Sequence, residues 1–289
     1  MTEILTMIAR ISVFVFVVGS MLALGLSLAV GHIIEPLKDL KRVALALIGN
    51  FVLVPLALFV ILLVIPVEEG VRIGLILLAA AGGAPFLPKL VQVAKGDVAF
   101  SVGLMLLLMV GTVIYMPLAL PFLLQGDQEV EVDALQIIKS LIITMLIPLG
   151  VGLVLRAKAE VTAAKLQFLV VKLANFSLIV LTVLLVALNF KNILSMIGLN
   201  GLAILCFIFA SLAVGFLLGG REPASCSVMG LGTGQRNIAA ALVVAGENFK
   251  DPEVLVTLIV TAIVGLLIFM PLGKVLGGKM DKIGKENQI

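Results

Sequence analysis

The stretch that decides the fold is SVMGLGTGQRNIAAALVVAG, residues 227–246, in which Arg236 lies between a glutamine and an asparagine among glycines and aliphatic residues. Such a run can be a phosphate-binding loop, a flexible hinge or a break in a membrane helix. A dinucleotide-binding loop requires GxGxxG between a strand and a helix. GLGTGQ lacks the last glycine and has no βαβ context, so the rest of the chain must decide between the other two.

Composition identifies a membrane protein. The chain has 289 residues, of which 62% are hydrophobic and 13% charged, and its mean hydropathy is +1.28. Apolar runs of about 20 residues, each long enough to cross a bilayer as a helix, recur from end to end. We therefore expect residues 1–289 to form a single all-α integral membrane domain. Nine spans are predicted, near 7–31, 43–65, 72–94, 98–124, 134–155, 166–189, 193–219, 223–246 and 253–276.

The loops between these runs alternate in charge. The basic segments are 35–42, 156–165 and 273–289, whereas 66–72, 125–133 and 246–253 are acidic. By the positive-inside rule, this pattern predicts an N terminus outside the cell and a cytoplasmic C terminus, in an inner or plasma membrane. The first run is longer than a signal-peptide core and lacks a small-residue cleavage site, so we expect a retained span.

Two of the runs contain helix-breaking residues in the middle. In 72–94 they are Gly82, Gly83, Pro85 and Pro88, and in 223–246 they are Gly230, Gly232 and Gly234. Non-helical backbone at membrane depth is tolerated only where protein or a water-filled cavity satisfies it. The two runs are five spans apart, which gives them opposite orientations. Interrupted segments in corresponding positions of two inverted repeats are typical of secondary transporters with a midplane site.

Four blocks then resemble the bile acid:sodium symporter family, whose bacterial members take up small organic anions: LGLSLAVG (24–31), NFVLVP (50–55), AKGDVAFSV (94–102) and GQRNIAAAL (234–242). The resemblance covers nearly the whole chain and implies the nine-helix form, with two broken helices that cross. It implies a panel domain of the spans near 7–31, 134–155 and 166–189. The core domain would then comprise the spans near 43–124 and 193–276.

The same resemblance shows where the chain departs from the family. Sodium ligands of the symporters fall here on Leu87, Pro88, Ser101, Met105, Gly230, Gly234 and Asn50, and of the original side chains only the serine at 101 is kept. The residues that remain as ion-site candidates are Asn50, Ser101, Gly230, Gly234 and Pro88. All 17 acidic residues lie in loops, termini or span edges, so we expect no conventional sodium site and no other metal site.

Positive charge takes the place of the missing acids. Arg236 lies near the middle of its run, where an uncompensated cation costs at least about 2.5 to 3.5 kcal/mol. It can bind the charged group of an organic anion, substitute for a bound cation, or satisfy loose carbonyl groups. The predicted substrate-binding residues are Arg236, Gln235, Asn237, Thr233 and Lys89. Lys89 can instead extend to the membrane interface or carry a coupling proton.

These observations predict an alternating-access carrier of a small organic anion that is not conventionally sodium-coupled. The alternatives are a sodium-coupled symporter with a non-standard ion site, and a passive channel or receptor on the same scaffold. We expect no enzyme, because HExxH, GxSxG and a pair of buried aspartates are missing and the single histidine, His32, lies at a span end. Cys206 and Cys226 form no CxxC motif, and we expect no cofactor and no nucleic-acid partner.

Overall fold

The computed structural model describes residues 2–28, 39–124 and 133–286, and every regular element within these ranges is a helix. The elements are α1 (Thr2–Ser27), α3 (Leu40–Ile48), η2 (Gly49–Leu53), α4 (Val54–Val64), α5 (Glu69–Ala80), α6 (Leu87–Val93), α7 (Val98–Leu123), α8 (Ala134–Leu141), η3 (Ile142–Leu146), α9 (Ile147–Lys158), α10 (Glu160–Leu188), α11 (Phe190–Ser195), α12 (Leu199–Leu218), α13 (Pro223–Gly234), α14 (Ile238–Asn248) and α15 (Pro252–Glu286). The two η elements are π-helical turns that join their neighbours into longer helices.

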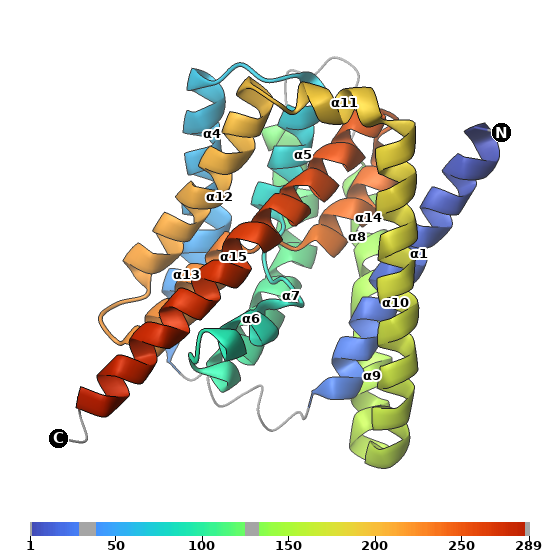
Figure 1. The fold of residues 1–289 in the computed structure, drawn as a ribbon. Helices are drawn as coiled ribbons and strands as arrows, with labels where there is room; N and C mark the ends of the chain where they lie inside the picture. Colours follow the sequence, from blue (N-terminus) through green and yellow to red (C-terminus); the bar gives the residue numbers. More distant parts are fainter. Residues whose placement is uncertain (1, 29–38, 125–132, 287–289) are drawn as a thin grey trace.

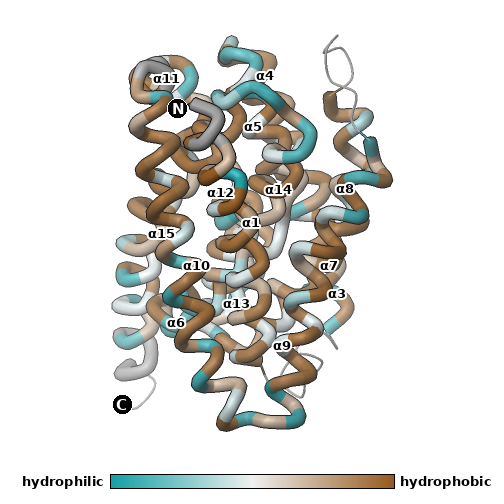
Figure 2. The backbone as a smooth tube through the Cα atoms, turned by 90° about the vertical axis from the view of Figure 1, so that its right-hand side faces the viewer, coloured by the Kyte–Doolittle hydropathy of each residue, from teal (hydrophilic) through white to brown (hydrophobic). Residues whose placement is uncertain are grey.

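Seven helical segments of the described chain are long and apolar enough to cross a membrane. They are Met7–Ser27, Leu40–Val64, Val98–Leu123, Ala134–Lys158, Glu160–Leu188, Leu199–Leu218 and Pro252–Asp281. Hydrophobic colour runs along most of the length of the bundle, and hydrophilic residues gather toward its two ends (Figure 2). Large apolar side chains such as Leu63, Phe122 and Leu217 are exposed on the outside. This is the surface of an integral membrane protein, with the all-α architecture predicted from composition.

Helices α1, α9 and α10 pack against one another and lie together on the right of Figure 1. Small residues allow this close approach, because a Cβ at Gly152 of α9 would lie 2.6 Å from the carbonyl oxygen of Leu22 in α1. A Cβ at Gly25 would likewise collide with the carbonyl oxygen of Leu149. Paired small residues are the usual way for membrane helices to bring their backbones together.

A second group of helices fills the left of Figure 1, where α12 packs along α13, α15 along α5, and α6 along α7. Helix α8 and the turn η3 continue into α9 and therefore belong with the first group. The two groups meet where α14 contacts α1 and α8, where α7 contacts α8, and where α15 contacts α10. The first turn of α1 and the last turn of α15 lie at opposite ends of the bundle (Figure 1).

The predicted spans near 72–94 and 223–246 are each divided into two short helices. Helix α5 ends at Ala80 and α6 begins at Leu87, whereas α13 ends at Gly234 and α14 begins at Ile238. None of these four short helices is long enough to span a bilayer alone. The seven continuous segments and these two divided ones lie where the sequence predicts nine spans, and the number of spans stays a prediction.

The second break does not lie where the glycines indicated. Gly230, Gly232 and Gly234 are all helical within α13, and the non-helical residues are 235–237. The glycines serve packing instead, because a Cβ at Gly230 would fall on the ring of Phe216 from α12. In the first break, by contrast, Gly83 has a φ of +77°, a conformation that favours glycine.

Candidate functional site

The two helix breaks meet, and we refer to residues 81–86 and 235–237 together as the crossing. Asn237 joins them directly, because its backbone N–H donates to the carbonyl oxygen of Ala81 at 2.9 Å. Its side-chain Nδ2 donates to the carbonyl oxygen of Gly83 at 3.1 Å, and its Oδ1 accepts from the N–H of Ala240 at 3.1 Å. Asn237 is fully buried, so one residue caps α14 and ties both breaks together.

Arg236 extends from the second break into the protein and is only 4% exposed. Nε donates to Leu78 O at 2.9 Å, and Nη1 donates to Asn50 Oδ1 at 2.7 Å and Thr233 O at 3.2 Å. Nη2 donates to Ala79 O at 2.8 Å and, more weakly, to Asn50 O at 3.4 Å. A guanidinium has five N–H groups, and each of them has an acceptor.

Helix ends compensate the charge of this guanidinium. Leu78 and Ala79 belong to the last turn of α5, and Thr233 belongs to the last turn of α13. The final carbonyl groups of a helix lack partners within the helix and carry a partial negative charge. None of the five acceptors around Arg236 is a carboxylate. The buried cation is therefore stabilised by the C-terminal ends of two interrupted helices.

Asn50 connects the crossing to a third segment. It lies fully buried in the π-helical turn η2, where its Oδ1 faces Arg236. Its Nδ2 donates to Ala46 O at 3.0 Å and to the hydroxyl oxygen of Thr233 at 3.1 Å. Of the predicted site residues, the structure thus brings together Asn50, Thr233, Arg236 and Asn237.

Thr112 of α7 binds the crossing and was not among the residues predicted from the sequence. Its hydroxyl accepts from the N–H of Gly82 at 2.8 Å and donates to the carbonyl oxygen of Gly82 at 3.0 Å. Both backbone groups of one non-helical residue are therefore satisfied by a single side chain. The available signal was that α7 contains a single threonine in a mostly apolar run, although such residues more often bond to their own helix.

Apolar side chains close the positions at which the family resemblance places sodium ligands. The ring of Phe216 occupies the space beside Gly230, and Leu212 fills the space beside Gly234, where a Cβ would come within 2.6 Å. Leu87 and Met105 are both completely buried. Ser101 keeps its hydroxyl, but this group donates to Val98 O of its own helix at 2.6 Å.

Of the other predicted site residues, Gln235 belongs to the crossing itself, whereas Pro88 and Lys89 follow the first break in α6. Lys89 is exposed on α6, and Pro88 is partly buried in the first turn of the same helix. Gln235 is partly buried, and its Oε1 is enclosed without a hydrogen-bond partner in the described part of the chain. Lys89 and Gln235 therefore keep an accessible or unsatisfied polar group, unlike Arg236 and Asn237.

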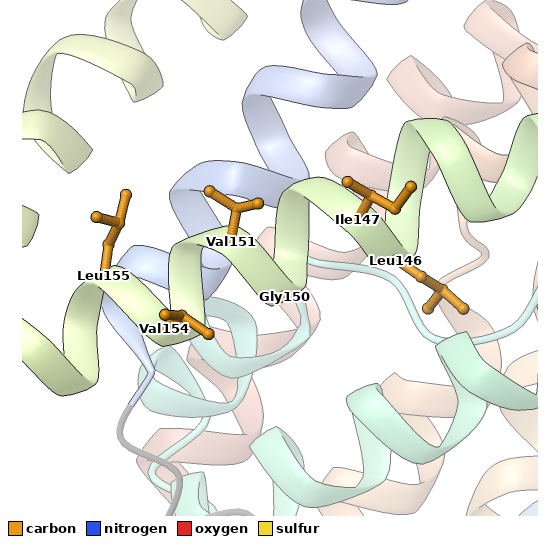
Figure 3. Close-up of a pocket in the computed structure, with 6 residues that line it drawn as sticks. All are labelled: Leu146, Ile147, Gly150, Val151, Val154 and Leu155. Carbon is orange, nitrogen blue, oxygen red and sulfur yellow. The ribbon is translucent and has the colours of Figure 1, made fainter.

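An apolar groove of about 580 Å³ lies along η3 and α9 and contains none of the predicted site residues. Its lining comes from one continuous helical segment (Figure 3): Leu146, Ile147, Gly150, Val151, Val154 and Leu155. The described residues contain no group of three histidine, cysteine or acidic side chains able to hold a metal ion. Cys206 and Cys226 are both free, and His32 lies outside the described residues.

Comparison with known proteins identifies the family. The model of the sodium bile acid symporter family matches residues 13–196, more than half of the chain. The chain belongs to the sodium bile acid symporter family. A relative from Arabidopsis thaliana, named probable sodium/metabolite cotransporter BASS3, chloroplastic, is 30% identical over 149 residues. That match covers 52% of this chain and 34% of the relative. The family match includes Asn50 and the first break but ends before α13 and Arg236.

Proposed function

We propose that this protein is a secondary carrier of a small organic anion that works by alternating access. Membership of a symporter family supports a transport function. The observation that carries the proposal is the hydrogen-bonded crossing of two interrupted helices, in which Asn237 binds Ala81 and Gly83. Crossed, discontinuous helices at the interface of inverted repeats are the usual place of a transporter's substrate site.

In this proposal the group α1, α8, η3, α9 and α10 is the panel domain and the remaining helices are the core. The core rocks against the panel, and the crossing moves with the core. The contacts between α14 and both α1 and α8 belong to the boundary that such a motion changes. The N terminus is outside and the C terminus cytoplasmic, in agreement with the basic segments and with the opposite placement of α1's first and α15's last turn (Figure 1).

We propose that Lys89 and Gln235 contact the anion. Gln235 is part of the crossing, Lys89 follows the first break by three residues, and both keep an exposed or unsatisfied polar group. Arg236, Asn237 and Thr233 form the scaffold behind them, because their polar groups already bond to the protein. A lysine ammonium suits a carboxylate or sulfonate group as a compact point charge.

Coupling to sodium is not conventional in this proposal. A sodium site needs several hard oxygen ligands. The positions that would supply a glutamate and a glutamine are Gly230 and Gly234, and Phe216 and Leu212 fill the adjacent space. The alternatives are a sodium-coupled symporter with a different ion site, and a passive channel on the same scaffold.

Counterflow in proteoliposomes tests the proposal. Vesicles loaded with an unlabelled keto acid, pantoate or a bile acid should accumulate the labelled anion transiently, equally well in sodium and in potassium. Lys89→Gln should raise KM about tenfold or more, which corresponds to roughly 1.4 kcal/mol of lost binding energy. Lys165→Gln removes the same charge from an exposed position on α10 and should leave KM unchanged.

The other outcomes identify the alternatives. Accumulation that requires an inward sodium gradient would show sodium coupling. Flux that does not saturate and shows no counterflow would identify a passive channel. A Lys89→Gln variant that transports like the wild type would remove this lysine from the substrate site.

A further inference from the structure

Arg236 has no N–H group left for a substrate. Its five donors face Leu78 O, Ala79 O, Thr233 O and both oxygens of Asn50, and 4% of the residue is exposed. A substrate could bind the guanidinium only by displacing protein acceptors, which would leave carbonyl groups unsatisfied inside the membrane. The site is therefore complete without an external anion.

The acceptors come from three separate segments of the chain. Two belong to the end of α5, one to the end of α13 and two to Asn50 in η2. Without a cation among them, these oxygens would face one another with partial negative charges and no donor. The arrangement is that of a binding site for a monovalent cation, and the cation is covalently part of the protein.

We propose that Arg236 is a built-in cation that holds α5, α13 and η2 together at the crossing, so that no dissolved ion is needed there. Arg236 is then a positioning residue for transport and not a substrate contact. This inference deepens the proposed absence of conventional sodium coupling, and its link to transport rests on the proposed carrier function. The claim that Arg236 holds the three segments together rests only on the contacts at the crossing.

The planar fork of the guanidinium determines which cation the site accepts. Five N–H groups in one plane meet five acceptor positions, a pattern that a spherical ion or a three-donor ammonium does not reproduce. Removing the side chain leaves a cavity that is lined by these oxygens. The guanidinium ion itself, from solution, is the ligand that such a cavity should take.

The test is chemical rescue of Arg236→Ala, measured as the thermal unfolding midpoint, Tm, in detergent. The substitution should lower Tm by about 5–15 °C, because it leaves several buried acceptors without a donor. Guanidinium chloride at about 1–20 mM should restore about half of the loss or more, with a saturable dependence on concentration. Urea has the same shape without the charge and should restore nothing.

Two further variants control the experiment. Arg156→Ala removes a guanidinium that is bonded to Glu160 near the end of α9, and its Tm should not respond to guanidinium. Arg236→Lys keeps the charge with fewer donors, so it should have an intermediate Tm. If Arg236→Ala yields no folded protein without guanidinium, purification in its presence, followed by removal, should give the same dependence.

The proposal is overturned if guanidinium leaves Arg236→Ala unchanged, if it raises both alanine variants equally, or if Arg236→Ala is as stable as the wild type. Because Tm is measured without substrate, the experiment distinguishes failure of the built-in cation from failure of the proposed carrier function. If the wild type shows no counterflow but guanidinium rescues Arg236→Ala, the carrier function is refuted and the built-in cation stands. If the wild type shows counterflow but guanidinium does not rescue Arg236→Ala, the built-in cation is refuted and the carrier function stands.

Discussion

The crossing and the contact between α1 and α9 both bring two backbones close together inside the membrane, and they do so by different means. At the crossing, Arg236 and Asn237 donate hydrogen bonds to carbonyl groups of α5 and of the first break. Between α1 and α9, Gly25 and Gly152 simply lack side chains. Intact helices satisfy their own backbone and need only complementary shape, whereas broken helices need donors from elsewhere.

The largest effect is expected at the glycine contact, from Gly152→Ala. A Cβ there would lie 2.6 Å from Leu22 O and 2.8 Å from the backbone N of Leu26, so rigid backbone must move. We expect a loss of about 3 kcal/mol or more in the free energy of unfolding. Gly150→Ala is the matched control two residues away, because nothing lies within 4 Å of its Cβ. Thermal unfolding should rank the two variants in this order, and equal stabilities would contradict the shape argument.

Asn237→Ala is expected to have the largest effect among neutral substitutions at the crossing. It removes the cap of α14 and leaves the Gly83 carbonyl without its donor, which together should cost about 2–3 kcal/mol. Asn248→Ala is the control, because Asn248 Nδ2 donates only to Val244 O within the end of α14. Its Tm should shift by about 2 °C or less. A similar shift in both variants would mean that Asn237 does not join the breaks.

Sequence alone led to the helical membrane architecture, to the segments that are interrupted, and to four residues that meet at the crossing. Hydrophobic run length and charge alternation are local signals, so they could be used directly. Arg236 was recognisable because a buried charge in an apolar run is costly and needs a partner. Its partners were not recognisable, since most of them are backbone carbonyl groups, such as those of Leu78 and Ala79, that carry no sequence signal.

Glycine and threonine show the same limit. The glycines of 230–234 predicted a break, yet α13 continues through them, and Phe216 and Leu212 pack in the space that their missing side chains leave. Composition does not distinguish a glycine that bends the chain from one that admits a neighbour. Thr112 looked like any hydroxyl in an apolar helix, and only the position of Gly82 beside it shows its role.

Gly230→Ala tests whether Gly230 bends the chain or instead makes room for a neighbouring side chain. If Gly230 serves packing, the added methyl group must displace the Phe216 ring and should cost about 2 kcal/mol. Phe216→Ala alone should also destabilise, because it removes a packed ring. The double variant should lose clearly less than the sum of the two, since each change relieves the other. Additive losses would show that the ring and the glycine do not compete for one space.

Thr112→Val is expected to have the smallest effect and gives the most direct comparison between the two regions. Valine keeps the shape but leaves the N–H and the carbonyl of Gly82 unsatisfied in a buried position, for a loss of about 1–2 kcal/mol. Thr144→Val makes the same change in η3, where the buried hydroxyl donates to Ser140 O of the same helical segment at 2.6 Å. That carbonyl is already part of a helix, so the loss there should be about 0.5 kcal/mol or less. Thr112→Ser should retain most of the stability, because the hydroxyl is kept. If the two valine variants have the same Tm, non-helical backbone depends on side-chain hydrogen bonds no more than helical backbone does. The proposed difference between the crossing and the intact helices would then be wrong.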